Sequence, residues 1–398
     1  MPLCQFVSTQ SKFYRFLDEI ETATWIAYDT EFISEGRYRP DLCLVQVAVE
    51  SGNYLLDPLA IRDLNPFWER LCREGTTSIA HSCRSELEFC YRAIGRIPTR
   101  IFDVQLAAAF VGYDYPLNFK ALTEATIGVE LEKTESRTDW SRRPLLKGQL
   151  DYAIQDVCYL KQIADRLAQE LEKRKRESWF VEETRAFCKA TLDSFGEDHW
   201  RKILGSKRYS QDELAIIRAL WFWRRDKAIA KGAPQTRILR DDLILELGKL
   251  KTSDPERISV VRGIKGTSNS ALVMELHEQI DAALLLDDAR KPVMETKRSY
   301  PQYALATQLI NILIGQYCHK HEISARLAAT VSDVREAIAD YAGTLPKGQT
   351  AKLMQGWRAE FLGKFVEDFL SGRYAMQFSD DLEELPLRII DVDKESDG

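Results

Sequence analysis

Short apolar runs alternate with amphipathic stretches over the first part of the chain, up to about residue 175. Four runs have the β-branched and aromatic composition of strands, namely 25–32, 42–49, 53–57 and the shorter 78–80. The segments 63–73 and 84–94, which stand on either side of the run 78–80, repeat apolar residues at helical spacing. This order predicts an α/β domain in which helices cover a sheet.

The pattern changes beyond residue 208, where amphipathic helical periodicity dominates and few strand-like runs remain. Two helical blocks are predicted, at 208–287 and 298–376. The polar stretch 287–292 has the composition of a linker between them.

Two pairs of polar residues stand out in the first domain. Asp29 and Glu31 lie in a predicted strand, and their spacing places both side chains on one face. Tyr152 and Asp156 are four residues apart in a predicted helix and also share a face. Such carboxylates can hold two divalent cations about 3.5–4 Å apart, the arrangement that hydrolyses phosphodiesters. An exonuclease is therefore the leading hypothesis.

These residues, with their flanking segments, resemble the tyrosine branch of the DEDD superfamily of 3′–5′ exonucleases, and most closely the ribonuclease D family. The matching segments are Asp29–Phe32, Arg39–Gln46, Leu55–Leu59, Phe102–Ala108 and Tyr152–Asp156. The resemblance implies a ribonuclease H-like exonuclease domain over residues 1–200, with a mixed sheet flanked by helices.

The second acidic motif departs from the family pattern. The family has an aspartate early in the helix that follows His81, and Glu86 occupies that place here. Glu88 is the rival ligand, but two helical positions are about 200° apart, so both cannot face one site. The resemblance therefore implies Glu86, and not Glu88, as the carboxylate of this motif.

The resemblance also implies roles and cofactors. Asp29 would bridge two divalent cations, and Glu31 and Asp156 would complete the cation on the nucleophile side. Glu86 would support the cation on the leaving-group side, and Tyr152 would orient the attacking water. The expected cofactors are two Mg²⁺ ions, with Mn²⁺ as a possible replacement.

The two helical blocks resemble HRDC domains, small helical modules that handle nucleic acid. In the first block the likeness rests on Leu220–Ala228, Ile238–Ile244 and 261–266. The second block is divergent, and only Gly356–Gly363 resembles the final helix of the module. The implied architecture is an exonuclease domain followed by two all-α HRDC-like domains.

Basic residues precede the helix that carries Tyr152. Arg137, Arg142, Arg143 and Lys147 are tentative RNA-binding residues, because a basic loop beside the site suits a phosphate backbone. A solvated surface explains the same charges, and both interpretations stay open. The run 173–176 is expected to be an exposed helix end.

Other conspicuous residues are given structural roles. Asp103 precedes an apolar helix and is expected to cap it, and Asp57 is expected in a turn. His81 is an unpaired histidine, which is usually structural. Three tryptophans that could stack on bases are instead expected in helical cores: Trp221, Trp223 and Trp357.

Composition adds the cellular context. The net charge of −6 is accounted for by the acidic segment 379–398, which is expected to be a disordered tail. The eight cysteines form no Cys-x-x-Cys pattern and suggest reduced thiols. Neither a signal peptide nor an apolar run of about 20 residues is apparent, so a cytoplasmic location is expected.

Together these features predict a monomeric, metal-dependent 3′–5′ exoribonuclease. Its substrate would be RNA with a free 3′ end, such as precursor tRNA, and its products nucleoside 5′-monophosphates. A DNA 3′–5′ exonuclease of repair is one alternative, because the same carboxylates serve both substrates. The other is a noncatalytic RNA-binding scaffold, in which Glu86 marks decay of the site.

Overall fold

The computed structural model of the chain describes residues 4–131, 138–194, 197–264, 267–268, 270–294, 300–379 and 386–392. The chain divides into two compact units. Unit 1 comprises Met1–Glu31, Leu44–Lys189 and Ser299–Gly398, and unit 2 comprises Phe32–Cys43 and Ala190–Arg298. In the described part of the chain, no helix is both long enough and apolar enough to cross a membrane.

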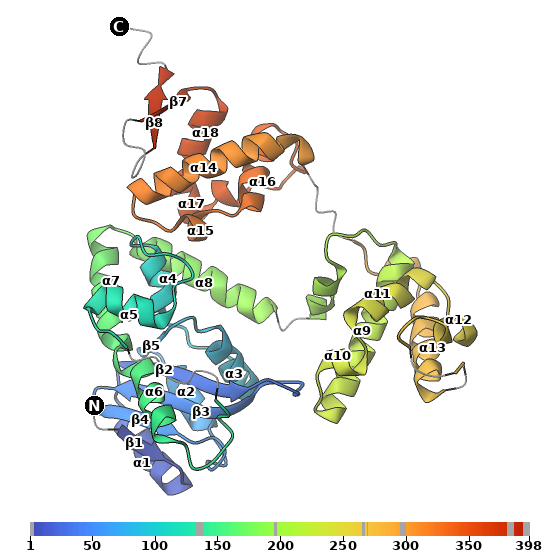
Figure 1. Cartoon of the computed structure of the whole chain (residues 1–398), viewed down its shortest axis with the longest axis horizontal. Helices are drawn as coiled ribbons and strands as arrows, with labels where there is room; N and C mark the ends of the chain where they lie inside the picture. The colour runs from blue at the N-terminus through green and yellow to red at the C-terminus, as the bar shows by residue number, and fades with distance from the viewer. Residues whose placement is uncertain are drawn as a thin grey trace. The chain divides into compact units, whose positions relative to one another are not determined.

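Within the described residues, unit 1 is built on a mixed sheet of six strands in the order β1-β4-β3-β2-β5-β6 (Figure 1). The strands are β1 (Cys4–Val7), β2 (Trp25–Ile33), β3 (Asp41–Val49), β4 (Gly52–Leu56), β5 (Thr77–Ala80) and β6 (Ile101–Asp103). β3 pairs antiparallel with β4, whereas β1 with β4, β2 with β5, and β5 with β6 are parallel. β2 is therefore an inner strand.

The predicted α/β pattern is confirmed. The four predicted strands correspond to β2, β3, β4 and β5, and the two predicted helices correspond to α2 (Asn65–Leu71) and α3 (Arg84–Ile94). The pattern missed β1 and β6, which have four and three residues. Strands this short cannot show a clear alternation of apolar and polar residues. Both lie at the edges of the sheet.

Helices cover both faces of the sheet. α1 (Gln10–Glu19) and α2 lie on one face, where the Phe16 ring is 4.9 Å from that of Tyr54 and 6.2 Å from that of Phe67. α6 packs on β4, and α7 packs on β5. The remaining helices of this region are α4 (Val104–Ala109), α5 (Phe119–Ile127), α6 (Lys147–Cys158), α7 (Leu160–Lys173) and α8 (Glu177–Asp193).

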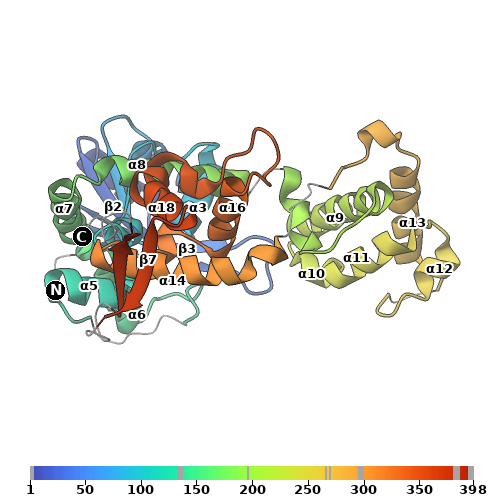
Figure 2. The same cartoon turned by 90° about the horizontal axis from the view of Figure 1, so that it is seen from above.

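Unit 2 is helical, as expected for residues 208–287. Its elements are η1 (Glu197–Leu204), α9 (Gln211–Lys231), α10 (Gln235–Ile238), α11 (Asp241–Leu250), α12 (Pro255–Ser259), α13 (Ala271–Leu284) and η2 (Asp288–Arg290). α11 and α13 pack on α9 (Figure 2). Gly248 permits the close approach of α11, because a Cβ there would lie 2.6 Å from the Ile217 side chain. Trp200 and Trp221 are buried in this core.

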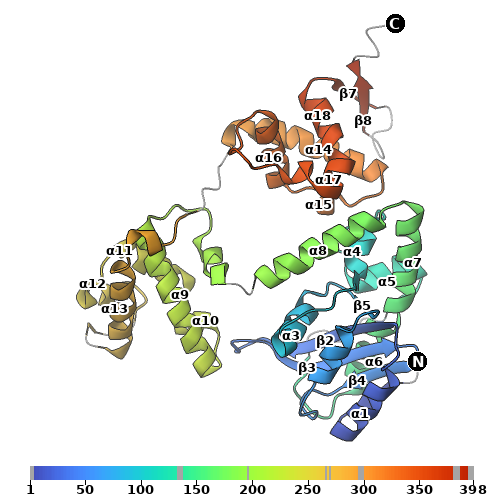
Figure 3. The same cartoon turned by 180° about the vertical axis from the view of Figure 1, so that it is seen from behind.

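The helices after residue 300 share a core with the first domain, within unit 1. They are η3 (Pro301–Tyr303), α14 (Ala304–Lys320), α15 (Ala325–Ala328), α16 (Val331–Tyr341), η4 (Lys352–Met354), α17 (Gly356–Arg358), η5 (Ala359–Gly363) and α18 (Lys364–Leu370). Figure 3 shows α4 and α8 on the side of unit 1 that faces α15 and α17. Trp357 is fully buried there, with its ring 4.9 Å from that of Phe110. We call residues 300–370 the carboxyl-terminal helical segment.

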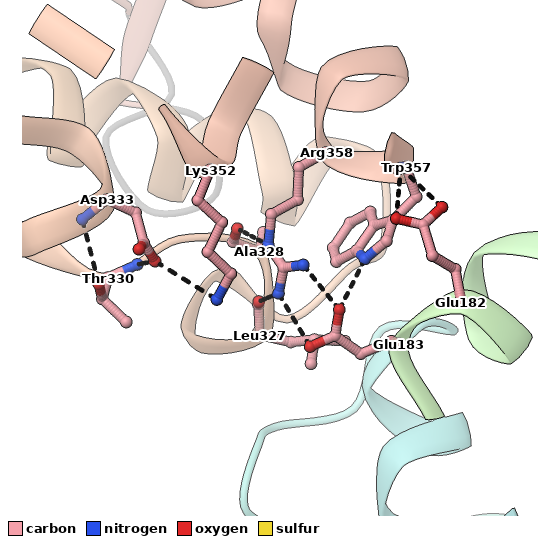
Figure 4. Close-up of polar contacts among 9 residues, drawn as sticks. All are labelled: Glu182, Glu183, Leu327, Ala328, Thr330, Asp333, Lys352, Trp357 and Arg358. Atoms are coloured by element: carbon pink, nitrogen blue, oxygen red, sulfur yellow. Dashed lines mark hydrogen bonds and ion pairs between the residues drawn. The ribbon is translucent and has the colours of Figure 1, made fainter. Parts of the chain in front are cut away.

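Charged side chains reinforce this packing (Figure 4). Glu183 of α8 accepts two hydrogen bonds from the Arg358 guanidinium, at 2.6 and 3.0 Å, and one from the Trp357 indole at 2.8 Å. Glu182 accepts from the Trp357 backbone N–H at 3.1–3.2 Å. Gly356 has a φ of +52°, and a Cβ there would collide with the Glu182 carboxylate. The carboxyl-terminal helical segment is thus held to α8 by a largely buried ionic contact.

A second polar bridge joins the same parts of unit 1. Arg176 donates hydrogen bonds of 2.6–2.9 Å to three backbone carbonyl oxygens. They belong to Phe110, His321 and Glu322. The expectation that 173–176 is simply an exposed helix end is therefore wrong for Arg176. A cluster of charges in sequence does not reveal which member meets a distant loop.

A second small sheet follows the carboxyl-terminal helical segment. β7 (Tyr374–Phe378) pairs antiparallel with β8 (Leu387–Asp391), and the Leu387 backbone N–H donates to the Gln316 side chain at 2.8 Å. The expectation of a disordered tail is therefore wrong for Leu387–Asp391. Its apolar residues can form a strand, and the acidic composition of the segment as a whole obscured them.

Candidate active site

The central strand β2 presents the first two acidic residues. Tyr28 points toward α2, where its ring is 6.4 Å from that of Phe67. Because side chains alternate along a strand, Asp29 and Glu31 point to the opposite face. Both are half-buried. The sheet therefore places this pair on the face against which α6 lies.

Helix α3 brings Glu86 to the same place. The Glu86 side chain is buried, at 4% exposed, and its Oε1 accepts a 2.7 Å hydrogen bond from the Thr30 hydroxyl. Burial, followed by the negative charge of Asp29, raises the pKa of the Glu86 carboxyl group. Glu88 instead forms an ion pair with Arg92 of the same helix.

Helix α6 supplies Tyr152 and Asp156 from adjacent turns. Its first turn is fixed by Gln149, whose side chain accepts from the Leu146 N–H at 2.9 Å. The Tyr152 ring lies 6.1 Å from the buried Trp140 ring. Burial, followed by the charge of Asp156, raises the pKa of the Tyr152 phenol. The phenol therefore stays protonated near neutral pH and can donate a hydrogen bond.

The four carboxyl groups strongly perturb one another. Burial raises the pKa of Glu31 to about 9 and the pKa values of Glu86 and Asp156 to about 8, and the negative charge of Asp29 adds to each. Burial also raises the pKa of Asp29, but only to about 6, because hydrogen bonds from the Thr30 backbone and Glu86 oppose it. A bound cation would stabilise the ionised forms of these groups.

The residues present fit a divalent cation. All four candidate ligands are carboxylates, and oxygen is the donor that Mg²⁺ prefers. The Oδ2 atom of Asp156 is buried without a hydrogen-bond partner, so it is available to an ion. Among the described residues, no three His, Cys, Asp or Glu side chains already form a set of metal ligands.

The basic residues before α6 differ in their surroundings. Arg143 forms a double hydrogen-bonded ion pair with the buried Asp57. Arg142 pairs with Asp139 but keeps 82% of its side chain exposed, and Lys147 is exposed. Arg137 lies outside the described residues. Arg142 and Lys147 are therefore the described cations that remain open to solvent here.

The residues given structural roles lie in structural contacts. Asp103 is the N-cap of α4, accepting from the Gln105 and Leu106 N–H groups at 2.9 and 3.3 Å. Asp57 accepts from the Leu59 N–H as well as from Arg143. The Nε2 atom of His81 lies 2.9 Å from the Leu117 carbonyl oxygen.

Two functional contacts were missed in the sequence. Thr30 was given no role in the sequence, yet its hydroxyl donates a hydrogen bond to Glu86. Asp103 was expected to cap α4 only, yet it also binds the start of α3. Both contacts join residues that are at least 20 positions apart in the sequence, and no local spacing signals them.

The fold and the carboxylate–tyrosine cluster define a 3′–5′ exonuclease, and the model of a 3′–5′ exonuclease family matches residues 4–172. Ribonuclease D of Nitrobacter hamburgensis is 31% identical to the chain, covering 88% of this chain and 91% of the relative. Ribonuclease D of Sphingobium indicum is also 31% identical, covering 94% and 96%. The chain belongs to the ribonuclease D family and is a 3′–5′ exoribonuclease.

A solved structure agrees with this conclusion. Escherichia coli ribonuclease D, described as an exoribonuclease involved in structured RNA processing, superposes with a TM-score of 0.79. The match has 27% sequence identity and covers 93% of this chain and 99% of that structure. The likeness therefore includes the helical regions as well as the exonuclease fold.

Proposed function

We propose that this enzyme trims 3′ extensions from structured RNA, such as precursor tRNA, and releases nucleoside 5′-monophosphates. The observation that carries the proposal is the cluster of Asp29, Glu31, Glu86 and Asp156, which three separate elements bring together beside Tyr152. A cluster of largely buried carboxyl groups with raised pKa values is costly to ionise unless it binds cations. The structured-RNA role of the Escherichia coli relative supports the substrate class.

Two divalent cations, Mg²⁺ or Mn²⁺, would be the cofactors, and when bound they would acidify a water and neutralise the leaving oxygen. Asp29 would ligate both, with Glu31 and Asp156 on one side and Glu86 on the other. Tyr152 would donate its phenolic proton in a hydrogen bond and so orient the attacking water. Because the pKa of this phenol is raised, Tyr152 acts as a positioning donor and not as a base.

The surroundings of the site suit an RNA strand. Arg142 is exposed just before α6 and Lys147 is exposed as its first residue, and contacts from such residues to phosphates would orient the strand without reading its sequence. Unit 2 and the carboxyl-terminal helical segment would act as HRDC-like modules that hold the body of the RNA. We place this enzyme in the cytoplasm as a monomer.

The test is a 5′-labelled RNA hairpin with a 3′ overhang, incubated with Mg²⁺ or with EDTA. The expected result is a ladder that shortens from the 3′ end and disappears with EDTA and in Asp29→Asn. A matched DNA hairpin in parallel separates RNA from DNA preference. RNA binding without shortening in either Mg²⁺ or Mn²⁺ would overturn the proposal and favour a noncatalytic scaffold.

A further inference from the structure

Asp103, at the edge of the sheet, contacts the starts of the two helices α3 and α4. It is the last residue of β6 and lies in register with Ala80 of β5. Its side chain is buried, at 4% exposed. Both carboxylate oxygens accept backbone hydrogen bonds, and the donors belong to the starts of two different helices.

The two oxygens divide these contacts unequally. Oδ1 accepts from Gln105 and Leu106 of α4, at 2.9 and 3.3 Å, and from Ser82 at 3.0 Å. Oδ2 accepts from the Cys83 N–H, at 3.0 Å. A cap for α4 requires only Oδ1. The Oδ2 contact is directed entirely at the segment that begins α3.

That segment is strained and lacks a cap of its own. Ser82 has a φ of +58°, in the left-handed region that L-residues rarely adopt. Cys83 is the N-cap residue of α3, and its side chain makes no capping hydrogen bond. The Asp103 carboxylate satisfies the N–H groups of both residues and so holds the turn in this conformation.

Glu86 lies immediately beyond this turn, as the third residue of α3. Its carboxylate is fixed from the other side by the 2.7 Å hydrogen bond from Thr30. The backbone that carries Glu86 is therefore set by Asp103, and its side chain is set by Thr30. A small movement at Ser82 and Cys83 would be transmitted directly to the Glu86 carboxylate.

We propose that Asp103 is a positioning residue of the exonuclease reaction, which holds Glu86 in place to receive a divalent cation. The inference rests on the proposed function in taking Glu86 as a cation ligand. It extends the role of Asp103 from a helix cap to a support for one particular ligand. Groups that orient metal ligands typically change metal affinity by 10–100-fold when they are lost.

Asp103→Asn separates the two roles of this residue. Asparagine is as good an N-cap as aspartate, so its carbonyl oxygen can still cap α4. Its amide nitrogen then faces the Cys83 N–H and cannot accept from it. If the amide rotates the other way, the α4 cap is lost and the melting temperature falls. Asp103→Ser is a second variant, which keeps a short cap but cannot reach α3.

The measurements are Mn²⁺ binding by isothermal titration calorimetry and the Mg²⁺ concentration that gives half-maximal RNA shortening. We expect Asp103→Asn to weaken Mn²⁺ binding at one site and to raise the Mg²⁺ requirement, each by about tenfold, with KM for RNA unchanged. Glu183→Gln is the matched control. It also alters a largely buried carboxylate of unit 1, but one that binds Arg358 and Trp357.

A double-mutant comparison tests the route of the effect. In a Glu86→Gln background, Asp103→Asn should cause little further change in Mn²⁺ binding, because its target is already lost. An equal effect in both backgrounds, or wild-type Mn²⁺ binding by Asp103→Asn, would overturn the proposal. Failure of the wild-type enzyme to bind Mn²⁺ or shorten RNA would instead overturn the proposed function.

Discussion

Arg143 donates two hydrogen bonds to the buried carboxylate of Asp57, from Nη2 to Oδ1 at 2.6 Å and from Nε to Oδ2 at 2.7 Å. Asp57 follows β4, and Arg143 belongs to the loop before α6. The pair therefore fixes to the sheet the loop that leads into the helix carrying Tyr152 and Asp156.

Arg143→Met should lower the free energy of unfolding by about 3 kcal/mol, because it leaves the Asp57 carboxylate buried without its cation. Urea denaturation measures this change. Arg142→Met is the matched control, since its exposed pair with Asp139 contributes less than about 1 kcal/mol. Equal stability of the two variants would contradict a structural role for Arg143.

In RNA binding, Arg142→Met should have a larger effect than Arg143→Met. Arg142→Met removes an exposed cation, so the slope of log affinity against log salt should fall by about one for one lost phosphate contact. Titration of labelled RNA at several salt concentrations provides the slope. An unchanged slope in Arg142→Met would show that Arg142 makes no phosphate contact.

The carboxylate cluster should make the stability of the metal-free protein depend on pH. Glu31, Glu86 and Asp156 have folded-state pKa values of about 8 to 9, above the ordinary values of unfolded side chains. A carboxyl group whose pKa is raised by folding favours the folded state most at low pH. This contribution to stability is lost as the pH rises through the folded-state pKa values of about 8 to 9.

The melting temperature in EDTA should therefore fall between about pH 6 and pH 9, and Mg²⁺ should restore it more at the upper end. Differential scanning calorimetry with and without Mg²⁺ tests this. Glu31→Gln is the control, because it removes the group with the highest of these pKa values and should flatten the profile. A Mg²⁺ effect that grows toward acid pH would be inconsistent with the cluster.

Replacing Glu86 by the aspartate that is usual in the family should reduce activity here. The Thr30 hydroxyl contacts Glu86 Oε1 at 2.7 Å, and a side chain one methylene shorter would draw the carboxylate away. A hydrogen bond to a charged group is worth about 1.5–3 kcal/mol, so we expect a loss of about tenfold or more in kcat/KM. Thr30→Val should cause a similar loss, and Thr30→Ser should retain most activity. Full activity of Glu86→Asp would show that Thr30 does not set the position of the carboxylate.

The ionic contact on α8 should determine how firmly the carboxyl-terminal helical segment is held. Arg358→Met leaves the Glu183 carboxylate without its cation. It also removes the hydrogen bonds that Arg358 donates to the Leu327 and Ala328 carbonyl groups. We expect a loss of about 3 kcal/mol in stability and faster amide hydrogen exchange in α15 and α17. Lys364→Met is the control, because 78% of its side chain is exposed. Unchanged exchange in Arg358→Met would exclude this role.

Much of the catalytic domain was predictable because its signals are local. The alternation in β2 placed Asp29 and Glu31 on one face, and helical geometry indicated that Glu86 and Glu88 could not both face the site; the structure pairs Glu88 with Arg92. Local spacing was also sufficient to assign Asp103 as a cap. These inferences use only neighbouring residues and the fixed geometry of strands and helices.

The unpredicted features depend on contacts between distant segments. Nothing near Arg143 indicates that it meets Asp57, and nothing near Arg176 indicates that it reaches the carbonyl oxygen of Phe110. The strand Leu387–Asp391 was hidden in the same way, because it forms only by pairing with β7. A basic or acidic residue has the same appearance in sequence whether it faces water or a buried partner.

The shared core of unit 1 has a consequence for how the chain is assembled. Unit 1 is discontinuous: the chain leaves it briefly at Phe32–Cys43, and again after Lys189 before it returns at Ser299. Residues 190–298 are therefore inserted into unit 1, although the sequence pattern predicts three consecutive domains. A protein shortened after residue 298 would expose the apolar surface around Phe110 and Phe180 that Trp357 and its neighbours cover. The first domain is thus completed only by the carboxyl-terminal helical segment, which follows unit 2 in the sequence.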